Sequence, residues 1–355
     1  MTEVGGGMDA VRRQRAVALV VAAVLLLAAV LAGVSIGAIA LPPAGVLATL
    51  LDKVGAGGLA PGHPLPTLQA EVLLDYRLPR VVLAAVVGGM LAVAGASYQG
   101  VFRNPLADPY LLGAAAGAGL GATLVIDFAP PTLARAQAMP IAAFAGALTG
   151  VGLAYALGSV AGRSGGGSAT LLLAGVAVAS FLTAVQTLVQ QAHAETLQQV
   201  YSWILGQLGA GQWSDVRMVL PYAALSSVVL LLSGRALDVL AVGDDEAATL
   251  GVRPARVRFA VLLAASLGTA SAVAVSGLIG FVGLVVPHVV RRLAGGSYRV
   301  VLPVSLLGGA AFLVVADLVA RTVLAPAELP IGVVTAFVGA PFFAALLRVG
   351  GSGST

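Results

Sequence analysis

Polar residues interrupt this apolar chain at few places, and the sharpest interruption is residues 103–109. They read Arg-Asn-Pro-Leu-Ala-Asp-Pro and lie between two hydrophobic runs. Proline has no N–H to donate, and it biases the preceding residue away from the helical region. A cation, an amide, an anion and two prolines in this stretch therefore predict a tight polar turn between two hydrophobic segments.

The longest hydrophilic segment inside the chain is residues 235–258, RALDVLAVGDDEAATLGVRPARVR. Asp244 or Asp245 can cap a helix N-terminus through a carboxylate-to-amide hydrogen bond, and acidic residues in a first turn suit the helix dipole. Gly251 is a natural C-terminal stop, and Pro254 can open a second helix. We therefore expect two short helices that form a docking surface, the alternative being a solvated connector.

One pair of opposite charges lies inside an apolar run. Asp317 and Arg321 are four residues apart, the spacing that brings them together on one helix face. Acidic residues inside membrane segments mark ion pathways in many transporters. A single acid does not make a proton relay, so we interpret the two residues as a structural ion pair.

Several kinds of chemistry have no support in the sequence. The chain has no cysteine, and its only lysine, Lys53, has no glycine-rich phosphate loop before it. His63, His193 and His288 lie in different segments, so we predict no metal site and no catalytic residue. Any ATP hydrolysis must then occur on another chain. The arginines punctuate apolar runs without clustering on one face, which argues against a nucleic acid partner.

The composition indicates a polytopic membrane protein. Hydrophobic residues make up 59% of the chain and charged residues 10%, whereas soluble domains carry about 25% charge. Backbone groups in lipid must be satisfied within their own segment, so each apolar run is expected to be a helix. We predict ten helices, at residues 16–41, 81–102, 110–128, 139–160, 169–190, 216–234, 259–275, 277–293, 300–320 and 331–348.

Arginine placement predicts the orientation. If the N-terminus is cytoplasmic and the spans alternate, most arginines lie inside, in agreement with the positive-inside rule. Both termini are then cytoplasmic. The remaining basic residues fall outside and need another explanation: Lys53, Arg77, Arg80, Arg135, Arg217 and Arg321.

We divide the chain into a cytoplasmic N-terminal segment (1–15), a transmembrane domain (16–348) and a flexible Gly/Ser-rich tail (349–355). The apolar run at 16–41 exceeds the roughly 7–15 residues of a signal-peptide core. We interpret it as a retained first span.

Glycines recur every fourth residue at Gly113, Gly117 and Gly121, and again at Gly146 and Gly150. Small residues at this spacing let helices approach closely in lipid. The pattern predicts packing faces on the two segments.

Several stretches resemble the permease subunits of type II ABC importers, the FecCD-type family that takes up ferric siderophores, haem and cobalamin. They follow one another in the order of the family and cover most of the chain from about residue 70 to 350. The stretches are RLPR (77–80), GASYQGVFRNPLADPYLLG (95–113), LLLAGVAVAS (171–180), VGDDEAATLGV (242–252), SGLIGFVGLVVPHVVRRLAG (276–295) and ADLVARTVLAPAELPIGVVTAFVGAPFFAALLR (316–348).

The resemblance implies an architecture and a set of partners. It implies a homodimer of ten-helix subunits around a central pathway, in the bacterial cytoplasmic (inner) membrane. Two ABC ATPase subunits would dock inside and carry ATP and Mg, so this chain itself would hold no cofactor. A periplasmic or lipid-anchored substrate-binding protein would dock outside.

The resemblance also implies roles for individual residues. Arg77, Arg80 and Arg321 match positions that pair with carboxylates of the binding protein. Gly167 departs from the family, where a hydroxyl residue is familiar at that position of the cytoplasmic gate. The gate positions are Asn104, Leu106, Gly167 and Ser168. The ATPase-coupling positions are Asp244, Asp245, Glu246, Ala247, Ala248, Leu250, Gly251 and Val252.

The function that this resemblance implies is the permease subunit of an ATP-driven importer of an iron complex, a ferric siderophore or haem. A cobalamin importer of the same family is an alternative. A secondary transporter driven by an ion gradient is an alternative of a different class, and it would need acids or broken helices with ion ligands near mid-span.

Overall fold

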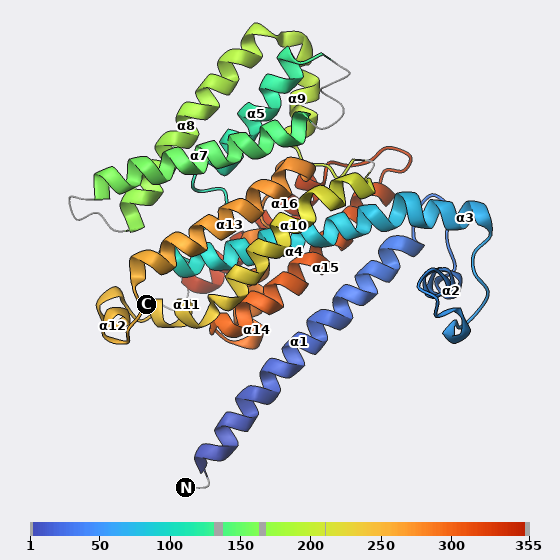
Figure 1. Cartoon of the computed structure of the whole chain (residues 1–355), viewed down its shortest axis with the longest axis horizontal. Coiled ribbons are helices and arrows are strands. Elements are labelled where there is room, and N and C mark those ends of the chain that lie inside the picture. Colours follow the sequence, from blue (N-terminus) through green and yellow to red (C-terminus); the bar gives the residue numbers. More distant parts are fainter. Residues whose placement is uncertain (1–2, 131–137, 163–167, 210, 352–355) are drawn as a thin grey trace.

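The computed structural model describes residues 3–130, 138–162, 168–209 and 211–351, and these ranges contain helices but no strand. Each of the ten predicted segments coincides with a helix, which confirms the all-α class (Figure 1). The ten helices are α1 (Glu3–Ser35), α4 (Leu78–Phe102), α5 (Ala114–Phe128), α7 (Met139–Gly162), α8 (Ser168–Ala192), α10 (Trp213–Leu232), α13 (Pro254–Ser276), α14 (Val282–Ala294), α15 (Tyr298–Thr322) and α16 (Ile331–Gly351).

Among the described residues, seven helices are long and apolar enough to cross a membrane. Two of the other three are shorter, because α5 has 15 residues and α14 has 13, whereas α16 has 21. A 15-residue helix rises about 22 Å, less than the roughly 30 Å of a hydrocarbon core. Non-helical backbone must therefore continue these helices, shielded from lipid by their neighbours.

The start of α14 shows how such backbone is shielded. Gly277 and Phe281 have φ angles of 66° and 69°, and the chain between them is not helical. A positive φ suits glycine and is uncommon for other residues. Next to this break, the N–H of Gln207 donates to the carbonyl of Ser276 at 2.8 Å. The predicted segment 277–293 is thus an irregular entry followed by a short helix.

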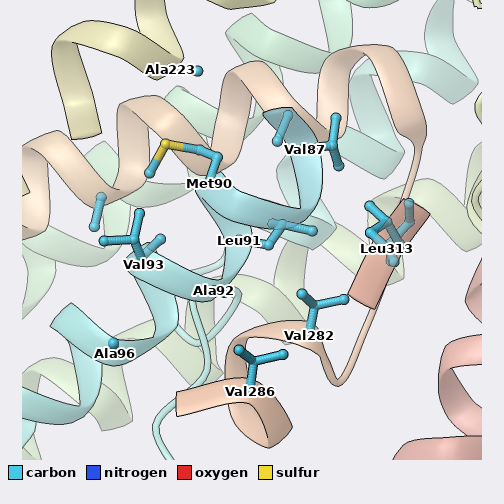
Figure 2. Close-up of a cluster of buried hydrophobic side chains, with 14 of the residues drawn as sticks. Val87, Met90, Leu91, Ala92, Val93, Ala96, Ala223, Val282, Val286 and Leu313 are labelled. Atoms are coloured by element: carbon cyan, nitrogen blue, oxygen red, sulfur yellow. The ribbon is translucent and has the colours of Figure 1, made fainter. Parts of the chain in front are cut away.

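Helix α4 is the centre of the fold. Twenty of its 25 residues are buried, and it packs against α10, α13, α14 and α15. Figure 2 shows its side chains from Val87 to Ala96 against Val282 and Val286 of α14 and Leu313 of α15. At Gly95 a Cβ would collide with the backbone of Gly283, so the absence of a side chain sets the spacing of α4 and α14.

Helices α5, α7 and α8 pack together as a second group, visible at the top of Figure 1. A Cβ on Gly117 would collide with the backbone of Gly146, and one on Gly121 with that of Ala142. The predicted packing faces of α5 and α7 are confirmed. Close backbone contact replaces large side chains at this interface, as in other membrane helix pairs.

The first helix has other bounds than the predicted segment 16–41. Helix α1 begins at Glu3 and ends at Ser35, and its apolar part is Arg13–Ser35. The division at residue 15 stays a prediction. After α1 the chain forms α2 (Pro43–Lys53), the 3₁₀ turn η1 (Gly57–Leu59), α3 (Thr67–Glu71) and the π-helical segment η2 (Val72–Arg77), which runs directly into α4. Figure 1 shows α2 and α3 at the end of the bundle opposite α12.

The hydrophilic segment 235–258, which we call the inner loop after its predicted side, holds most of two short helices, α11 (Gly234–Leu240) and α12 (Asp244–Thr249). Two details of the prediction were wrong. The residue before α12 is Gly243, with φ 150°, and no side chain caps the helix, because Asp244 itself lies in the first turn. Pro254 opens the long helix α13, where its missing N–H costs nothing at the first helical position.

Candidate functional site: the Asp244 loop and the Asp317 charge cluster

Asp244 fastens the inner loop to two other elements. Its carboxylate accepts two hydrogen bonds from Arg258 of α13, at 2.6 and 2.7 Å. Arg103, which follows the last residue of α4, donates to the same carboxylate at 2.9 Å. We call these three residues the Asp244 bridge. It joins α12 to the base of α13 and to the turn at 103–109.

The Asp244 bridge remains charged at neutral pH. The hydrogen bond from Arg258 holds the pKa of the Asp244 carboxyl below its usual range. A carboxyl group whose pKa is lowered by folding stabilises the folded state at every pH above its ordinary pKa. That stabilisation is lost as the pH falls through the lowered pKa. The bridge is therefore intact across the physiological range. Its members are partly exposed, so each ion pair adds only a modest stability.

The side of α12 that faces away from the bundle is exposed and can contact a partner. Ala247 is buried and anchors the helix to the bundle, whereas Leu250 is 66% exposed. Val252 is half-buried. The exposed predicted coupling residues are Asp245, Glu246, Ala248, Leu250 and Gly251. Acidic and apolar groups thus project together from the end of the molecule that is predicted to face the cytoplasm.

The turn at 103–109 is fixed by side-chain hydrogen bonds. The carboxamide oxygen of Asn104 accepts the N–H of Leu106 at 2.9 Å, and the Asp108 carboxylate accepts the N–H of Tyr110 at 2.8 Å. These local bonds are typical of turns built on Asn and Asp. Leu106 is 59% exposed at the tip. The tight turn that the prolines predicted is confirmed, with Leu106 as its projecting side chain.

Asp108 supplies a pH-dependent prediction. Burial raises the pKa of its carboxyl to about 6, although the hydrogen bond from Tyr110 acts in the opposite direction. A raised carboxyl pKa means that the folded state binds the proton more tightly than the unfolded state does. The stability of the fold therefore falls as the pH rises from the ordinary pKa of the carboxyl group to about 6. We expect Asp108→Asn to raise the melting temperature at pH 7.5 and to change it little at pH 4.5. A thermal melt in detergent at both values tests this, and an equal change at both would contradict it.

Tyr110 and Gln99 connect this turn to α14, and the sequence reasoning missed both. The Tyr110 hydroxyl donates to the carbonyl of Ile279 at 3.1 Å, and the Gln99 amide donates to that of Gly283 at 3.0 Å. Ile279 lies in the irregular entry of α14. Gly283 is the second residue of α14, and its carbonyl lacks the usual helical donor because the residue four positions on, Pro287, has no N–H. Polar side chains in otherwise apolar stretches were the available signal.

The predicted cytoplasmic gate is only partly described. Asn104 and Leu106 share the turn at 103–109, as their spacing requires. Ser168 is the first residue of α8. Gly167 lies outside the described residues. The gate assignment as a whole stays a prediction.

A charge cluster joins α4 and α15 near the opposite end of the bundle. The Asp317 side chain is fully buried, and Arg80 contacts it at 2.8 Å. Arg80 also donates two hydrogen bonds of 2.9 Å to Glu328, whose side chain is 50% exposed. Arg321 is 3.4 Å from the second Asp317 oxygen, without hydrogen-bond geometry. The predicted ion pair of Asp317 and Arg321 exists, but Arg80 is the stronger partner.

Arg77 does not lie on the surface that its predicted docking role requires. It is 8% exposed, and its guanidinium donates to the carbonyls of Val34 and Ser35 at 3.0 and 3.1 Å and also to Ile39. These carbonyls lie at and just after the end of α1, where a helix lacks internal donors. The docking assignment of Arg77 is a poor fit to this geometry, because its side chain caps α1.

The same arrangement limits the other two docking candidates. Arg321 donates to the carbonyl of Gly33 in the last turns of α1. The side chains of Arg80 and Arg321 are largely buried. The two guanidinium groups are therefore engaged inside the chain, and Glu328 is the exposed member of the cluster.

We expect Arg77→Gln to destabilise the protein. Hydrogen bonds to charged groups contribute about 1.5–3 kcal/mol each, and the shorter glutamine cannot satisfy all three carbonyls. Arg217→Gln is the matched control, because Arg217 is exposed on α10. Melting temperatures in detergent should fall several degrees for the first variant only. Weaker capture of a binding protein by Arg77→Gln with an unchanged melting temperature would restore the docking role.

Sequence comparison places this geometry in context. Residues 25–349 match the model of the FecCD transport family. The ABC transporter permease protein YvrB of Bacillus subtilis is 40% identical over 346 residues, which cover 95% of this chain and 94% of the relative. The cobalamin import system permease protein BtuC of Halobacterium salinarum is 44% identical, with 80% and 75% covered. The hemin transport system permease protein HmuU of Yersinia pestis is 42% identical, with 77% and 82% covered.

A solved structure shares the fold. It is described as an inward-facing conformation of a metal-chelate type ABC transporter. The TM-score is 0.80 at 29% identity, and the match covers 93% of this chain and 98% of that chain.

Proposed function

Because the chain belongs to the FecCD transport family, we propose that it is the membrane-spanning permease subunit of an ATP-driven importer of an iron complex, a ferric siderophore or haem. The observation that carries this proposal is the family match along residues 25–349. The multi-pass helical structure agrees with it. The chain conducts the substrate, and hydrolysis of ATP with Mg takes place on separate subunits.

The inner face supports docking of two ATPase subunits. Helix α12 projects Asp245, Glu246 and Leu250 away from the bundle, and buried Ala247 fixes its orientation. A movement imposed on α12 would pass to α13 and to the turn at 103–109 through the Asp244 bridge. Rigid, close-packed helices transmit such displacements without absorbing them.

A second copy of the chain is the remaining membrane partner that we propose. Large apolar side chains on α8 and α16 are exposed, among them Leu173, Phe181, Leu188 and Phe337. A homodimer with a central pathway would cover part of these faces, and lipid would cover the rest. In the outer region, Glu328 and its neighbours are the proposed contact for a periplasmic or lipid-anchored binding protein.

The proposed membrane is the bacterial cytoplasmic membrane, with both termini inside. Arg13 and Arg15 lie at the start of α1, and Arg348 lies near the end of α16. Figure 1 shows the N-terminal end of α1 and α12 toward the same end of the bundle, and α2 and α3 toward the other. This arrangement supports the predicted alternation of spans.

The substrate assignment rests on the relatives. The hemin permease HmuU and the Fe(3+) dicitrate permease FecD of Escherichia coli are each 42% identical to this chain. The cobalamin permease BtuC, at 44%, favours cobalamin as a second candidate. The three substrates differ in size and polarity, so a conduit without strong ligands of its own would suit each of them.

Reconstituted transport tests the function. Proteoliposomes would contain the permease with its cognate ATPase, and the cognate binding protein would be loaded with ferric siderophore, hemin or cobalamin. We expect ATP-dependent uptake of an iron complex that persists when ionophores collapse ion gradients. Uptake that needs an ion gradient and no ATP would identify a secondary transporter and overturn the proposal. Uptake of cobalamin alone would overturn the substrate assignment and leave the importer intact.

A further inference from the structure

A groove of about 430 Å³ lies between α1, α14 and α15, away from the coupling face and the charge cluster. Its walls include Val17, Val21 and Leu25 of α1, with Val289 and Leu293 of α14 opposite them. The three α1 residues are about half exposed, so the groove opens on the surface of the bundle. The volume lies within the roughly 300–1,000 Å³ of small-ligand sites.

Sequence features keep this groove open. Helix α15 lines the groove with Val304, Gly308 and Phe312, which are four residues apart and so lie on one helix face. A Cβ on Gly308 would lie 3.3 Å from Val286 of α14, tighter than an ordinary contact. Helix α1 packs extensively on α15 and only slightly on α14. Figure 1 shows α1 crossing the bundle at an angle that separates its N-terminal half from the other helices.

Positive charge gathers at one end of the groove. Gln14, the polar residue of its lining, stands between Arg13 and Arg15 on α1. Neither Arg13 nor Arg15 forms an ion pair with a residue whose side chain the structure describes.

We propose that this groove binds an anionic phospholipid of the surrounding bilayer. One acyl chain lies along the apolar walls, and the phosphate headgroup lies against Arg13 and Arg15, which flank the lining residue Gln14. The acyl chain covers the exposed apolar surface of α1 and fills the space between α1 and α14, so that the side chains lining the groove gain van der Waals contacts. Basic pockets between membrane helices select anionic headgroups in the same way. The lipid completes the contact between α1 and α14.

The test measures lipid binding to the complete permease–ATPase complex in detergent. Native mass spectrometry follows titrations with dioleoyl phosphatidylglycerol and with dioleoyl phosphatidylcholine. We expect tighter binding of phosphatidylglycerol, and Val21→Phe should weaken it roughly tenfold by narrowing the groove. Val24→Phe is the matched control, because Val24 lies on the same helix with similar exposure and does not line the groove.

The headgroup contact has its own variant. Arg13→Gln combined with Arg15→Gln should abolish the preference for phosphatidylglycerol over phosphatidylcholine. If Val21→Phe cannot be purified as a complex, Val289→Phe narrows the same groove from α14. Equal binding of the two lipids by the natural chain would overturn the proposal. Equal effects of Val21→Phe and its control Val24→Phe on lipid binding would overturn it as well.

A second copy of the chain is the competing occupant. The natural sequence has no cysteine, so Val21→Cys introduces a single reactive thiol. We expect it to be labelled slowly by a thiol reagent in phosphatidylglycerol nanodiscs and rapidly after delipidation. Formation of a disulfide-linked dimer through this position would show that another protomer covers the groove and would overturn the lipid assignment.

Discussion

Asp317→Leu will lower the stability of the protein more than any other single change considered for the charge cluster. The carboxylate is fully buried and is the main partner of Arg80. Its removal leaves the buried guanidinium groups of Arg80 and Arg321 close together, with only Glu328 to offset them. Breaking a buried pair by removing one partner costs about 3–5 kcal/mol, because a buried charge is left uncompensated.

Two further variants separate this explanation from a loss of packing. Glu328→Gln removes the exposed partner of Arg80 and should cost about 0–1 kcal/mol. Adding Arg80→Leu to Asp317→Leu removes one uncompensated cation, so the double variant should be more stable than Asp317→Leu alone. Melting temperatures and the yield of monodisperse protein in detergent provide the measurements. An equal loss for Glu328→Gln and Asp317→Leu would contradict the argument.

The cluster also illustrates which contacts a sequence can predict. The spacing of Asp317 and Arg321 indicated their pairing, because four residues define one helix face. The stronger contact joins Asp317 to Arg80, which is 237 residues away in the sequence. No local pattern carries that information. It depends on how α4 and α15 pack.

The docking prediction for Arg77 fits the structure poorly for a related reason. It rested on an outside placement predicted from charge distribution, and the positive-inside rule says nothing about the partner of an outside arginine. The end of α1 supplies unpaired carbonyls within its reach. Which side chain donates hydrogen bonds to a helix end cannot be predicted until the packing of the neighbouring helix is known.

The ten apolar segments and the glycine faces were predictable, because both follow from short-range periodicity and from the solvent. The boundaries of the inner loop were not. The motif of acids at 244–246 suggested a side-chain cap, yet Asp244 points to Arg258 and Arg103. The hydrogen bonds with Arg258 and Arg103 occupy the carboxylate of Asp244, so it does not cap the helix, which begins one residue away from its expected cap.

That bridge leads to the second large effect, on transport. Asp244→Asn keeps the shape of the side chain but removes the charge that Arg103 and Arg258 share. The exposed face of α12, with Asp245, Glu246 and Leu250, is unchanged, so ATPase docking should persist. We expect ATP hydrolysis within about twofold of the natural complex and a roughly tenfold slower uptake. This equals about 1.4 kcal/mol of coupling.

The expected loss of uptake follows from how few contacts connect α12 to the turn at 103–109. The structure provides one charged link, through Arg103, and that link shares its carboxylate with the anchor at Arg258. Arg103→Gln should therefore reproduce most of the uptake defect while α12 stays anchored. Arg258→Gln should also slow uptake and leave hydrolysis within about twofold, because buried Ala247 still anchors α12. Arg256→Gln is the matched control, since Arg256 is exposed in the same turn of α13.

The outcome separates transmission from docking. If Asp244 transmits movement, uptake falls while hydrolysis and ATPase binding are retained, which is an uncoupled phenotype. If Asp244 only positions α12 for docking, hydrolysis and uptake fall in parallel, and Arg103→Gln has no effect. The lowered pKa of Asp244 adds a condition: the defect of Asp244→Asn should be the same at pH 6 and pH 8, because the natural carboxylate is ionised at both. A defect that disappears at pH 6 would assign the coupling to another group.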